Sequence, residues 1–296
     1  MITAEEIKRT ARDKLRDNYL PAVLGAVIYY TPAYIRNMIN NVMLVSGMSA
    51  VLLNIVSVVL SIVFGLAVMD ILHIGYIRSL LKISSPKAID TEIGPKYDVN
   101  IVLSGYRMNF KNTIKVVFFK NLYIFGWTAL IMLPYLVCVG VYIFITPPEA
   151  VSELYDIIMA YSQSPTPIMM QNIVQKLGET GVYMEYILTG AGFTALALCI
   201  PLIRKVYEYN AVAMIVAENP SMPRKEVFAT ARVVMHGYRF RYFLLQLSFI
   251  GFWILTALVV RVSDGSIVVY YIANALITPY IMMAYLEFYL VRTKYL

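Results

Sequence analysis

The sequence predicts an all-α membrane protein, a bundle of six transmembrane helices. Hydrophobic residues make up 59% of the 296 residues and charged residues only 15%, a composition that does not suit a water-exposed surface. Several apolar stretches are long enough to cross ~30 Å of hydrocarbon. The basic residues gather on alternate connecting segments, as the positive-inside rule requires of a protein with several spans. Together these observations exclude an ordinary soluble domain.

The first 18 residues are expected to form a short amphipathic helix in the cytosol, ahead of a membrane domain over residues 19–296. Thr3 and Glu6 have the spacing of a capping box, which marks a helix start. The apolar residues that follow at helical spacing are Ile7, Ala11 and Leu15. This stretch lacks the apolar core and cleavage site of a signal peptide, so we expect the first span to direct insertion.

Six spans are predicted, at about residues 19–35, 51–69, 122–145, 182–203, 242–260 and 266–286. The first contains two prolines and is so short that it barely crosses the hydrocarbon. The second is expected to continue as a helix beyond residue 69 into the headgroup region. Gly190 and Gly192 in the fourth span predict close contact with a neighbouring helix.

Residues 146–180 predict a helical hairpin on the outer surface. Pro147 and Pro148 precede a first helical pattern, a Ser-Pro-Thr-Pro stretch separates it from a second, and Gly178 ends that one. We expect the hairpin to pack as a lid over the helix ends.

The distribution of basic residues predicts the orientation. With both termini in the cytosol, only three of the 25 Lys and Arg residues fall on outer segments, namely Arg36, Lys176 and Arg261. An odd number of spans, or inverted termini, would destroy this asymmetry. We therefore expect the protein in the cell (cytoplasmic) membrane with both termini cytosolic.

A short basic helix is predicted between Pro223 and Gly237, just before the fifth span. Proline suits a first helical position and glycine the position just past a helix end. The apolar residues of the helix form one stripe, so we expect the helix to lie in the membrane interface. The cationic residues expected to bind anionic lipid headgroups here are Arg224, Lys225, Arg232, Arg239 and Arg241.

Polar residues inside the spans are the remaining candidates. A buried charge near the middle of a span usually marks an ion or proton path, and none is evident. The polar candidates are Asn54, Gln246, Ser248 and Asn274. Such side chains also join helices at ~1 kcal/mol per hydrogen bond, and we favour that structural role. Asp70 and His73 lie three residues apart at the cytosolic boundary, where we expect a hydrogen-bonded pair.

The motifs of several enzyme classes are missing from the sequence. It has no Gly-rich phosphate loop with Lys, no pair of histidines beside a glutamate and no Gly-x-Ser-x-Gly elbow. Two histidines cannot build a three-histidine metal site, and Cys138 and Cys199 lie in apolar runs, where they serve as small hydrophobic residues. We therefore expect no catalytic residue, no cofactor and no metal. The net charge of +7 is spread over one membrane face, so nucleic acid is not an expected partner.

Four stretches carry a resemblance to a known family. The longest has Met235-His236-Gly237, an aromatic and basic cluster, and then Leu-Leu-x-Leu-Ser-Phe-Ile-Gly-Phe. The others are Ala11-Arg12 with Leu15 and Asn18, Leu103-Ser104-Gly105-Tyr106, and Ile200-Pro201. They resemble the domain-of-unknown-function 975 family of bacterial integral membrane proteins. Gln246 stands where that family is expected to have an acidic residue, and residues 146–180 are longer than the family needs. The resemblance implies fold and location and supplies neither substrate nor catalytic residues.

The function that we favour from the sequence is a non-enzymatic accessory or scaffold protein that binds anionic lipid or a partner in the membrane. A small-molecule permease is the main alternative, suggested by prolines within spans but weakened by the lack of mid-membrane charge and of an internal repeat. A lipid-modifying enzyme at the cytosolic boundary is the second alternative. The residues that such an enzyme would have to use are Asp70, His73, Glu208 and His236.

Overall fold

The computed structural model describes residues 3–45, 50–85, 97–145, 183–263 and 265–294, with a few isolated positions between 152 and 175. These residues form helices and no strand, so the all-α prediction is confirmed. The chain divides into two compact units, one of Met1–Leu122 with Val206–Leu296 and the other of Tyr123–Lys205. The predicted outer hairpin, 146–180, falls almost wholly outside the described residues.

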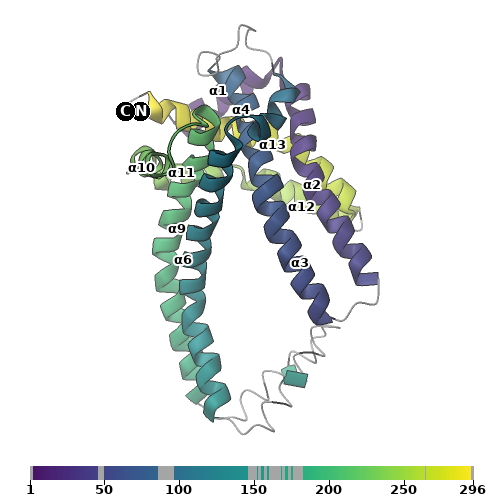
Figure 1. Ribbon diagram of the computed structural model, residues 1–296, viewed down its shortest axis with the longest axis vertical. Helices are drawn as coiled ribbons and strands as arrows, with labels where there is room; N and C mark the ends of the chain where they lie inside the picture. The colour runs from purple at the N-terminus through teal and green to yellow at the C-terminus, as the bar shows by residue number, and fades with distance from the viewer. Residues whose placement is uncertain are drawn as a thin grey trace. The chain divides into compact units, whose positions relative to one another are not determined.

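The helices follow one another along the chain in the order shown by the labels of Figure 1. They are α1 (Ala4–Leu15), α2 (Tyr19–Val45), α3 (Ala50–Phe64), the π-helical turn η1 (Gly65–Met69), α4 (Asp70–Ser84), the 3-10 helix η3 (Val99–Leu103), α5 (Ser104–Arg107), α6 (Phe110–Ile145), α9 (Tyr183–Glu218), α10 (Arg224–Met235), α11 (Arg239–Leu247), α12 (Ile250–Val262) and α13 (Ile267–Thr293).

In the first unit the first and last described helices pack together. Helix α1 contacts α13. Helices α2 and α12 also pack against α13. The last helix of the chain is therefore the one around which the rest of this unit is arranged.

Helix α1 begins where the capping box predicted. The backbone N–H of Thr3 donates to Glu6 Oε2 at 2.7 Å, and the N–H of Glu6 donates to Thr3 Oγ1 at 3.2 Å. The predicted apolar stripe is buried. Since that stripe packs on α13, the helix is part of the protein core of the first unit.

Among the residues that the structure describes, five helical stretches are long and apolar enough to cross a membrane, which indicates a membrane protein. They are Ile55–Ser84, Phe110–Cys138, Thr189–Glu218, Arg239–Val262 and Ile267–Thr293. They correspond to five of the six predicted spans. The predicted first span, 19–35, forms part of the longer helix α2 and is not among the five.

Two details differ from the predictions. The fifth predicted span is not one helix, because a turn at Ser248 and Phe249 separates α11 from α12. A Cβ atom placed on Gly190 would meet no atom within 4 Å, so the close helix contact predicted at Gly190 is wrong, whereas one on Gly192 would lie 3.8 Å from the Tyr135 hydroxyl of α6. The buried small residues of that stretch are instead Ala191 and Ala195. The spacing of small residues identified the helix but not the face that packs.

The second predicted span continues beyond residue 69 through a π-helical turn. Helix α3 ends at Phe64, and η1 leads directly into α4 with the Asp70 N–H donating to Gly65 O. A π turn adds one residue to the helical repeat and so rotates every side chain after it. The continuous helix that we predicted through this region is confirmed, but its register changes just before Asp70.

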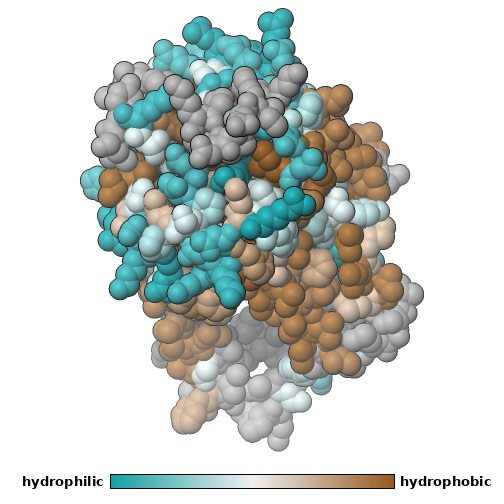
Figure 2. Space-filling model, turned by 45° about the horizontal axis from the view of Figure 1, so that its top comes forward, coloured by the Kyte–Doolittle hydropathy of each residue, from teal (hydrophilic) through white to brown (hydrophobic). Residues whose placement is uncertain are grey.

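The buried side chains of the first unit gather where α1, the end of α13, α4 and the end of α9 meet. Many apolar residues along α3, α6 and α12 are exposed instead, as expected where lipid takes the place of water. On the face that Figure 2 shows, hydrophilic side chains gather in one region and hydrophobic ones in another. Because the charged helices α1 and α10 bury their apolar stripes in this core, we call this part of the first unit its polar end.

Buried cations in this core have defined partners. The Arg78 guanidinium is 8% exposed and donates to Ala217 O at 2.7 Å, at the C-terminal end of α9 where backbone carbonyls lack helical partners. Lys82 is 2% exposed and lies 3.8 Å from the Asp98 carboxylate. These contacts fix α4 to α9 and to η3.

Candidate functional site

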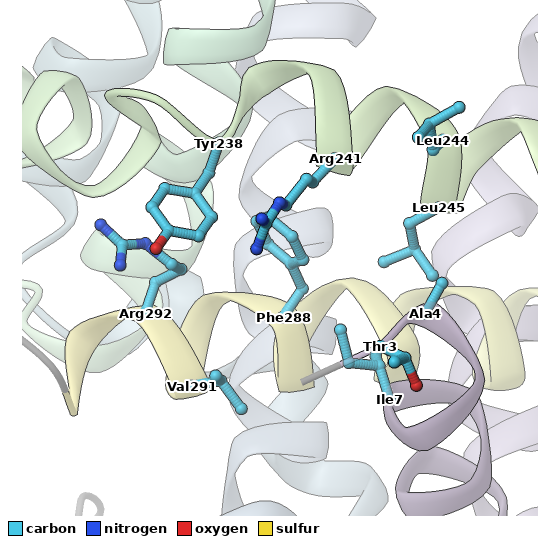
Figure 3. Close-up of a pocket in the computed structure, with 10 residues that line it drawn as sticks. All are labelled: Thr3, Ala4, Ile7, Tyr238, Arg241, Leu244, Leu245, Phe288, Val291 and Arg292. Atoms are coloured by element: carbon cyan, nitrogen blue, oxygen red, sulfur yellow. The ribbon is translucent and has the colours of Figure 1, made fainter. Parts of the chain in front are cut away.

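The first unit contains a pocket of about 630 Å³ where α1, α11 and α13 meet. We call it the arginine pocket. It is lined by Thr3, Ala4, Ile7, Tyr238, Arg241, Leu244, Leu245, Phe288, Val291 and Arg292. These residues come from the start of α1, from α11 and the turn before it, and from the end of α13 (Figure 3). Segments from both ends of the sequence thus build a single site.

Helical spacing explains why these side chains share the pocket. On α13, Phe288, Val291 and Arg292 are three and four residues apart and so lie on one face. Residues 238, 241 and 245 repeat the same spacing before and along α11. The left-handed backbone of Gly237, with φ of 74°, turns the chain between α10 and α11 at little conformational cost because glycine has no Cβ. The predicted glycine at the end of the basic helix is therefore confirmed.

Two guanidinium groups approach one tyrosine ring in the pocket. The Arg292 guanidinium carbon lies 3.5 Å from the centroid of the Tyr238 ring, and that of Arg241 lies 5.4 Å from it. Both distances allow cation–π attraction. Arg292 also donates from Nε to Val234 O at 3.4 Å. In Figure 3 the tyrosine ring lies between the two arginine side chains.

The rest of the pocket lining is mostly apolar. Leu245 is buried and Phe288 is 5% exposed, whereas Leu244 is 43% exposed and forms the open side. None of the described residues that line the pocket is acidic. A site with two cations at one end and an apolar wall matches a ligand that is itself both anionic and apolar.

Helix α1 is held in place by a polar contact near its C-terminal end, about two turns from the residues that line the pocket. Lys14 Nζ donates to Glu287 Oε1 at 2.7 Å and to Ser84 Oγ at 2.9 Å, and Ser84 also hydrogen-bonds Glu287. Glu287 is only 5% exposed, so its carboxylate depends on these donors. The same contact fixes the α1 wall of the pocket to α13.

The structure separates the five predicted headgroup residues. Arg224 lies over the Phe119 ring at 3.7 Å, and Arg239 forms an ion pair with the buried Glu208 at 2.5 Å. Lys225 and Arg232 are exposed on α10. Of the five, Arg241 is the one that lines the pocket.

The apolar stripe of α10 does not face a membrane interface as we expected. Val227, Ala231, Val234 and Met235 are all at most 1% exposed and belong to the protein core. An apolar stripe needs cover, but its spacing does not say whether lipid or protein supplies it. Arg292, which the sequence analysis did not single out, joins Arg241 in the pocket. Its position in the last turn of the last helix carried no signal of this partner.

Asp70 and His73 are not joined by a hydrogen bond. Asp70 instead accepts from Lys120 Nζ at 2.9 Å and from Asn121 Nδ2 at 2.6 Å. The His73 ring lies 5.6 Å from the Tyr29 ring, and its Nε2 is buried without a hydrogen-bond partner. The expected pair is therefore wrong, because Lys120 and Asn121 of α6 bind the Asp70 carboxylate instead.

The polar candidates within the spans mostly bond within their own helix. Asn274 is 2% exposed and donates from Nδ2 to Tyr270 O at 2.8 Å, and Ser248 donates to Leu245 O at 2.6 Å. Gln246 interacts with Tyr242, one turn earlier. The Asn54 side chain lies outside what the structure describes. The interhelical role that we expected is thus not observed for Asn274, Ser248 or Gln246.

The four residues that a lipid-modifying enzyme would need do not gather in one place. Glu208 is paired with Arg239, Asp70 with Lys120, and His236 is exposed at the end of α10. Within the part of the chain that the structure describes, no three His, Cys, Asp or Glu side chains come together as a metal site would need.

Comparison with known proteins gives one result. A family model described as "Protein of unknown function (DUF975)" matches residues 1–294. No curated protein and no solved structure matches the chain significantly.

Proposed function

This chain belongs to the DUF975 family of proteins of unknown function, and we propose that it is a non-enzymatic accessory or scaffold protein of the cell membrane that binds anionic lipid. The single observation that supports this role is the arginine pocket. Two guanidinium groups meet there at one end of an apolar cavity whose lining has no acidic residue. Anionic lipids are the membrane molecules whose chemistry matches such a surface.

We propose six spans with both termini in the cytosol. Helix α2 supports the sixth span, because its 27 residues extend about 40 Å at 1.5 Å per residue. It packs along α13, which is itself apolar enough to span. Its exposed apolar residues, suited to contact with lipid, include Leu20, Leu24, Val27, Ile35 and Val42. An even number of spans keeps most basic residues on one side.

Lipid selectivity tests the proposed role. The protein is reconstituted in phosphatidylcholine bilayers, and the fraction of spin-labelled lipid immobilised on it is measured by electron paramagnetic resonance. We expect a larger immobilised fraction for spin-labelled phosphatidylglycerol than for spin-labelled phosphatidylcholine, and we expect salt to reduce the difference because exposed charges are screened. Equal fractions for the two lipids would contradict the proposal.

Transport of a small molecule is a second candidate function, and one observation favours it. Asp70 and Lys120 form an ion pair at 2.9 Å within two stretches apolar enough to span the membrane. Ionisable residues within spans often line a pathway. The π-helical turn just before Asp70 adds to this, since such turns occur frequently at functional sites.

Reagent access to position 121 tests the transport role. Cys138 and Cys199 are first replaced by Ser, and then Asn121, which contacts Asp70, is replaced by Cys. A membrane-impermeant thiol reagent is added to either side of sealed vesicles. Labelling from both sides would support alternating access, whereas labelling from one side or neither would argue against transport.

A further inference from the structure

We propose that the first unit is a closed ring of three helical repeats, in which α1 packs on α13 as the cap of the repeat that would follow α13. Each repeat has a short segment that we call the cap, then a first arm and a second arm. The caps are α1, η3 with α5, and α10. The first arms are α2, α6, and α11 with α12, and the second arms are α3 with η1 and α4, α9, and α13. Helices α6 and α9 take part with the segments that belong to this unit. The ring goes beyond the proposed function and does not depend on lipid binding.

The first and third repeats match position by position where they begin. Helices α1 and α10 each have 12 residues, and a turn of three residues follows each before the first arm starts at Tyr19 or Arg239. A shift of 220 positions superposes both helices, both turns and both starts. The buried positions 7, 11 and 15 of α1 then fall on the buried positions 227, 231 and 235 of α10. The residues identical in this superposition are Glu6 and Glu226, Thr10 and Thr230, Ala11 and Ala231, and Arg12 and Arg232.

The arms of the repeats also correspond. The fourth residue of each first arm is at most 2% exposed, and the seventh is buried too. In the order α2, α6 and α11, the fourth residues are Ala22, Thr113 and Tyr242, and the seventh are Gly25, Val116 and Leu245. In the second arms, Gly75 lies nine residues before the end of α4, and Ala284 lies nine residues before the end of α13. A tyrosine follows each of them.

Each cap packs on the second arm of the repeat before it. Segment η3 packs on α4, and the Phe228 ring of α10 lies 5.5 Å from the Tyr209 ring of α9. In both cases the chain itself leads from the second arm to the cap. Helix α1 packs on α13 in the same way, although no peptide link joins them. Chain order cannot explain this place of α1, whereas a ring of repeats does.

An ion pair joins each repeat to the next one in the same direction. In every case the carboxylate belongs to a second arm, and the cation belongs to the cap or the first arm of the following repeat. The pairs are Asp70 with Lys120 at 2.9 Å, Glu208 with Arg239 at 2.5 Å, and Glu287 with Lys14 at 2.7 Å. Carboxylates withdrawn from water depend on such partners. The Asp70–Lys120 pair thereby has a structural role, as the counterpart of the pair between Lys14 and Glu287.

Closure through space makes the face of α13 beneath α1 an acceptor surface for an amphipathic helix. A repeat buries its apolar face only against its neighbours, and no repeat follows α13 in the sequence. The cover comes from Ile7, Ala11 and Leu15 of α1, and Lys14 supplies the cation. Few identical residues mark the repeats, so the correspondence becomes visible only once the packing is known.

An exchange of caps tests the correspondence in the full-length protein. Residues 4–15 are replaced by the sequence of residues 224–235, with Lys14 kept so that Glu287 retains its cation. The capping box survives, because Thr3 is unchanged and Glu226 falls on position 6. We expect the thermal unfolding midpoint in neutral detergent to stay within a few degrees of the wild type. Amide protection of residues 4–15, measured by hydrogen exchange, should stay within about threefold.

The matched control carries residues 225–236 in the same place, again with Lys14 kept. Nearly the same helix is then shifted by one residue, which turns its apolar stripe by about 100° away from α13. Amide protection should fall by roughly tenfold or more, which corresponds to ~1.4 kcal/mol. Equal protection in the matched and the shifted variant, whether kept or lost, would overturn the correspondence between α1 and α10.

A circular permutant is an independent test that leaves every cap sequence unchanged. The chain begins at Ser221 and ends at Pro220, and about ten Gly and Ser residues join Leu296 to Met1. The link between α9 and α10 is then missing, as it is between α13 and α1 in the wild type. We expect α10 to keep its wild-type amide protection. Loss of that protection, or failure of the permutant to fold, would overturn the ring. No lipid is added in these experiments, so the spin-label test of the proposed function is decided separately.

Discussion

Gly75 and Gly105 determine how closely α4 approaches η3 and α5. A Cβ atom on Gly75 would lie 1.9 Å from Val102 O, and one on Gly105 would lie 2.6 Å from Ile71 O. Both neighbours are backbone atoms, which cannot move aside as a flexible side chain can. The two glycines are therefore required by close approach of two backbones.

We predict that Gly75→Ala destabilises the protein by ~1–3 kcal/mol, as overpacking in a filled core does. The thermal unfolding midpoint in detergent should fall by several degrees. Gly251→Ala is the control, since a Cβ atom there meets no atom within 4 Å. Alanine favours a helix over glycine by up to ~1 kcal/mol, so this variant should match or exceed the wild type. A Gly75→Ala protein that unfolds like the wild type would contradict the close approach.

We predict that the capping box makes stability depend on pH in the acid range. The pKa of the Glu6 carboxyl is lowered from its usual 4.5, chiefly because the backbone N–H of Thr3 donates to it. A carboxyl with a lowered folded-state pKa contributes stability above its unfolded pKa and loses that contribution as pH falls through the folded value. The wild type should therefore unfold at a higher temperature than Glu6→Gln at neutral pH.

The same comparison at lower pH gives the sign of the effect. The difference between the two midpoints should shrink below pH 4.5 and vanish once Glu6 is protonated in the folded protein. A difference that is constant from neutral pH to about pH 3 would show that the Glu6 charge does not contribute.

Some residue roles were visible in the sequence and others were not. The Thr3 and Glu6 capping box could be predicted because both partners lie within one helical turn. The ion pair of Arg239 with Glu208 joins residues 31 positions apart, and sequence spacing carries no record of such a contact. The same holds for Arg292 and Tyr238, which only the packing of α13 against α11 brings together.

At the scale of single elements, the periodicity of apolar residues predicted the helices, but it did not predict whether protein or lipid packs on their apolar faces. Helix α10 was predicted as amphipathic, and it is. The structure covers its stripe with protein rather than with lipid, and leaves Lys225 and Arg232 exposed. The π-helical turn η1 and the break between α11 and α12 were not predicted, because local deviations in a long apolar run leave its composition unchanged.

We predict that Lys14→Met loosens α1 from α13. The substitution leaves the Glu287 carboxylate buried with Ser84 as its remaining partner. Breaking a buried pair costs up to ~3–5 kcal/mol, and the 32% exposure of the Lys14 side chain places the loss at the lower end or below. Trypsin should then cleave α1 at Arg12 faster than in the wild type, while cleavage in α10 is unchanged.

The double variant Lys14→Met with Glu287→Leu separates the charge from the packing. It removes both partners, so no carboxylate is left buried without its cation, and it should recover much of the lost stability. If the double variant were as unstable as the sum of the two single variants, Lys14 and Glu287 would not act as a pair.

At the scale of the whole molecule, we predict six spans from the charge distribution and from the length of α2. Alkaline phosphatase fused after Gly47, Gln163 or Asp264 should be active, because the enzyme folds only outside the cytosol. Fusions after Pro95, Pro223 and Leu296 should be inactive. Activity after Pro95, or none after Gly47, would show that α2 does not cross and would leave the five stretches found by composition.

The whole fold was predictable in outline because lipid imposes strong rules on apolar length and charge. The contents of the polar end were not, because residues there obey the packing rules of a soluble protein core. The arginine pocket takes residues from around positions 3, 241 and 292. These three segments are adjacent only in the folded chain, and no motif in the sequence indicates a cavity.

The pairing of α1 with α13 also sets the order in which this protein can be made. Lys14 and Glu287 are 273 residues apart, so α1 cannot dock on α13 until α13 is synthesised, although α4 is available to it earlier. At ~5–20 residues per second this wait lasts on the order of tens of seconds. Throughout that time the buried stripe of α1 faces water, membrane or a chaperone. Truncation from either end therefore removes the contact between α1 and α13. A chain that ends before α13 leaves the apolar stripe of α1 without its main cover, and quality-control proteases can recognise such an exposed stripe.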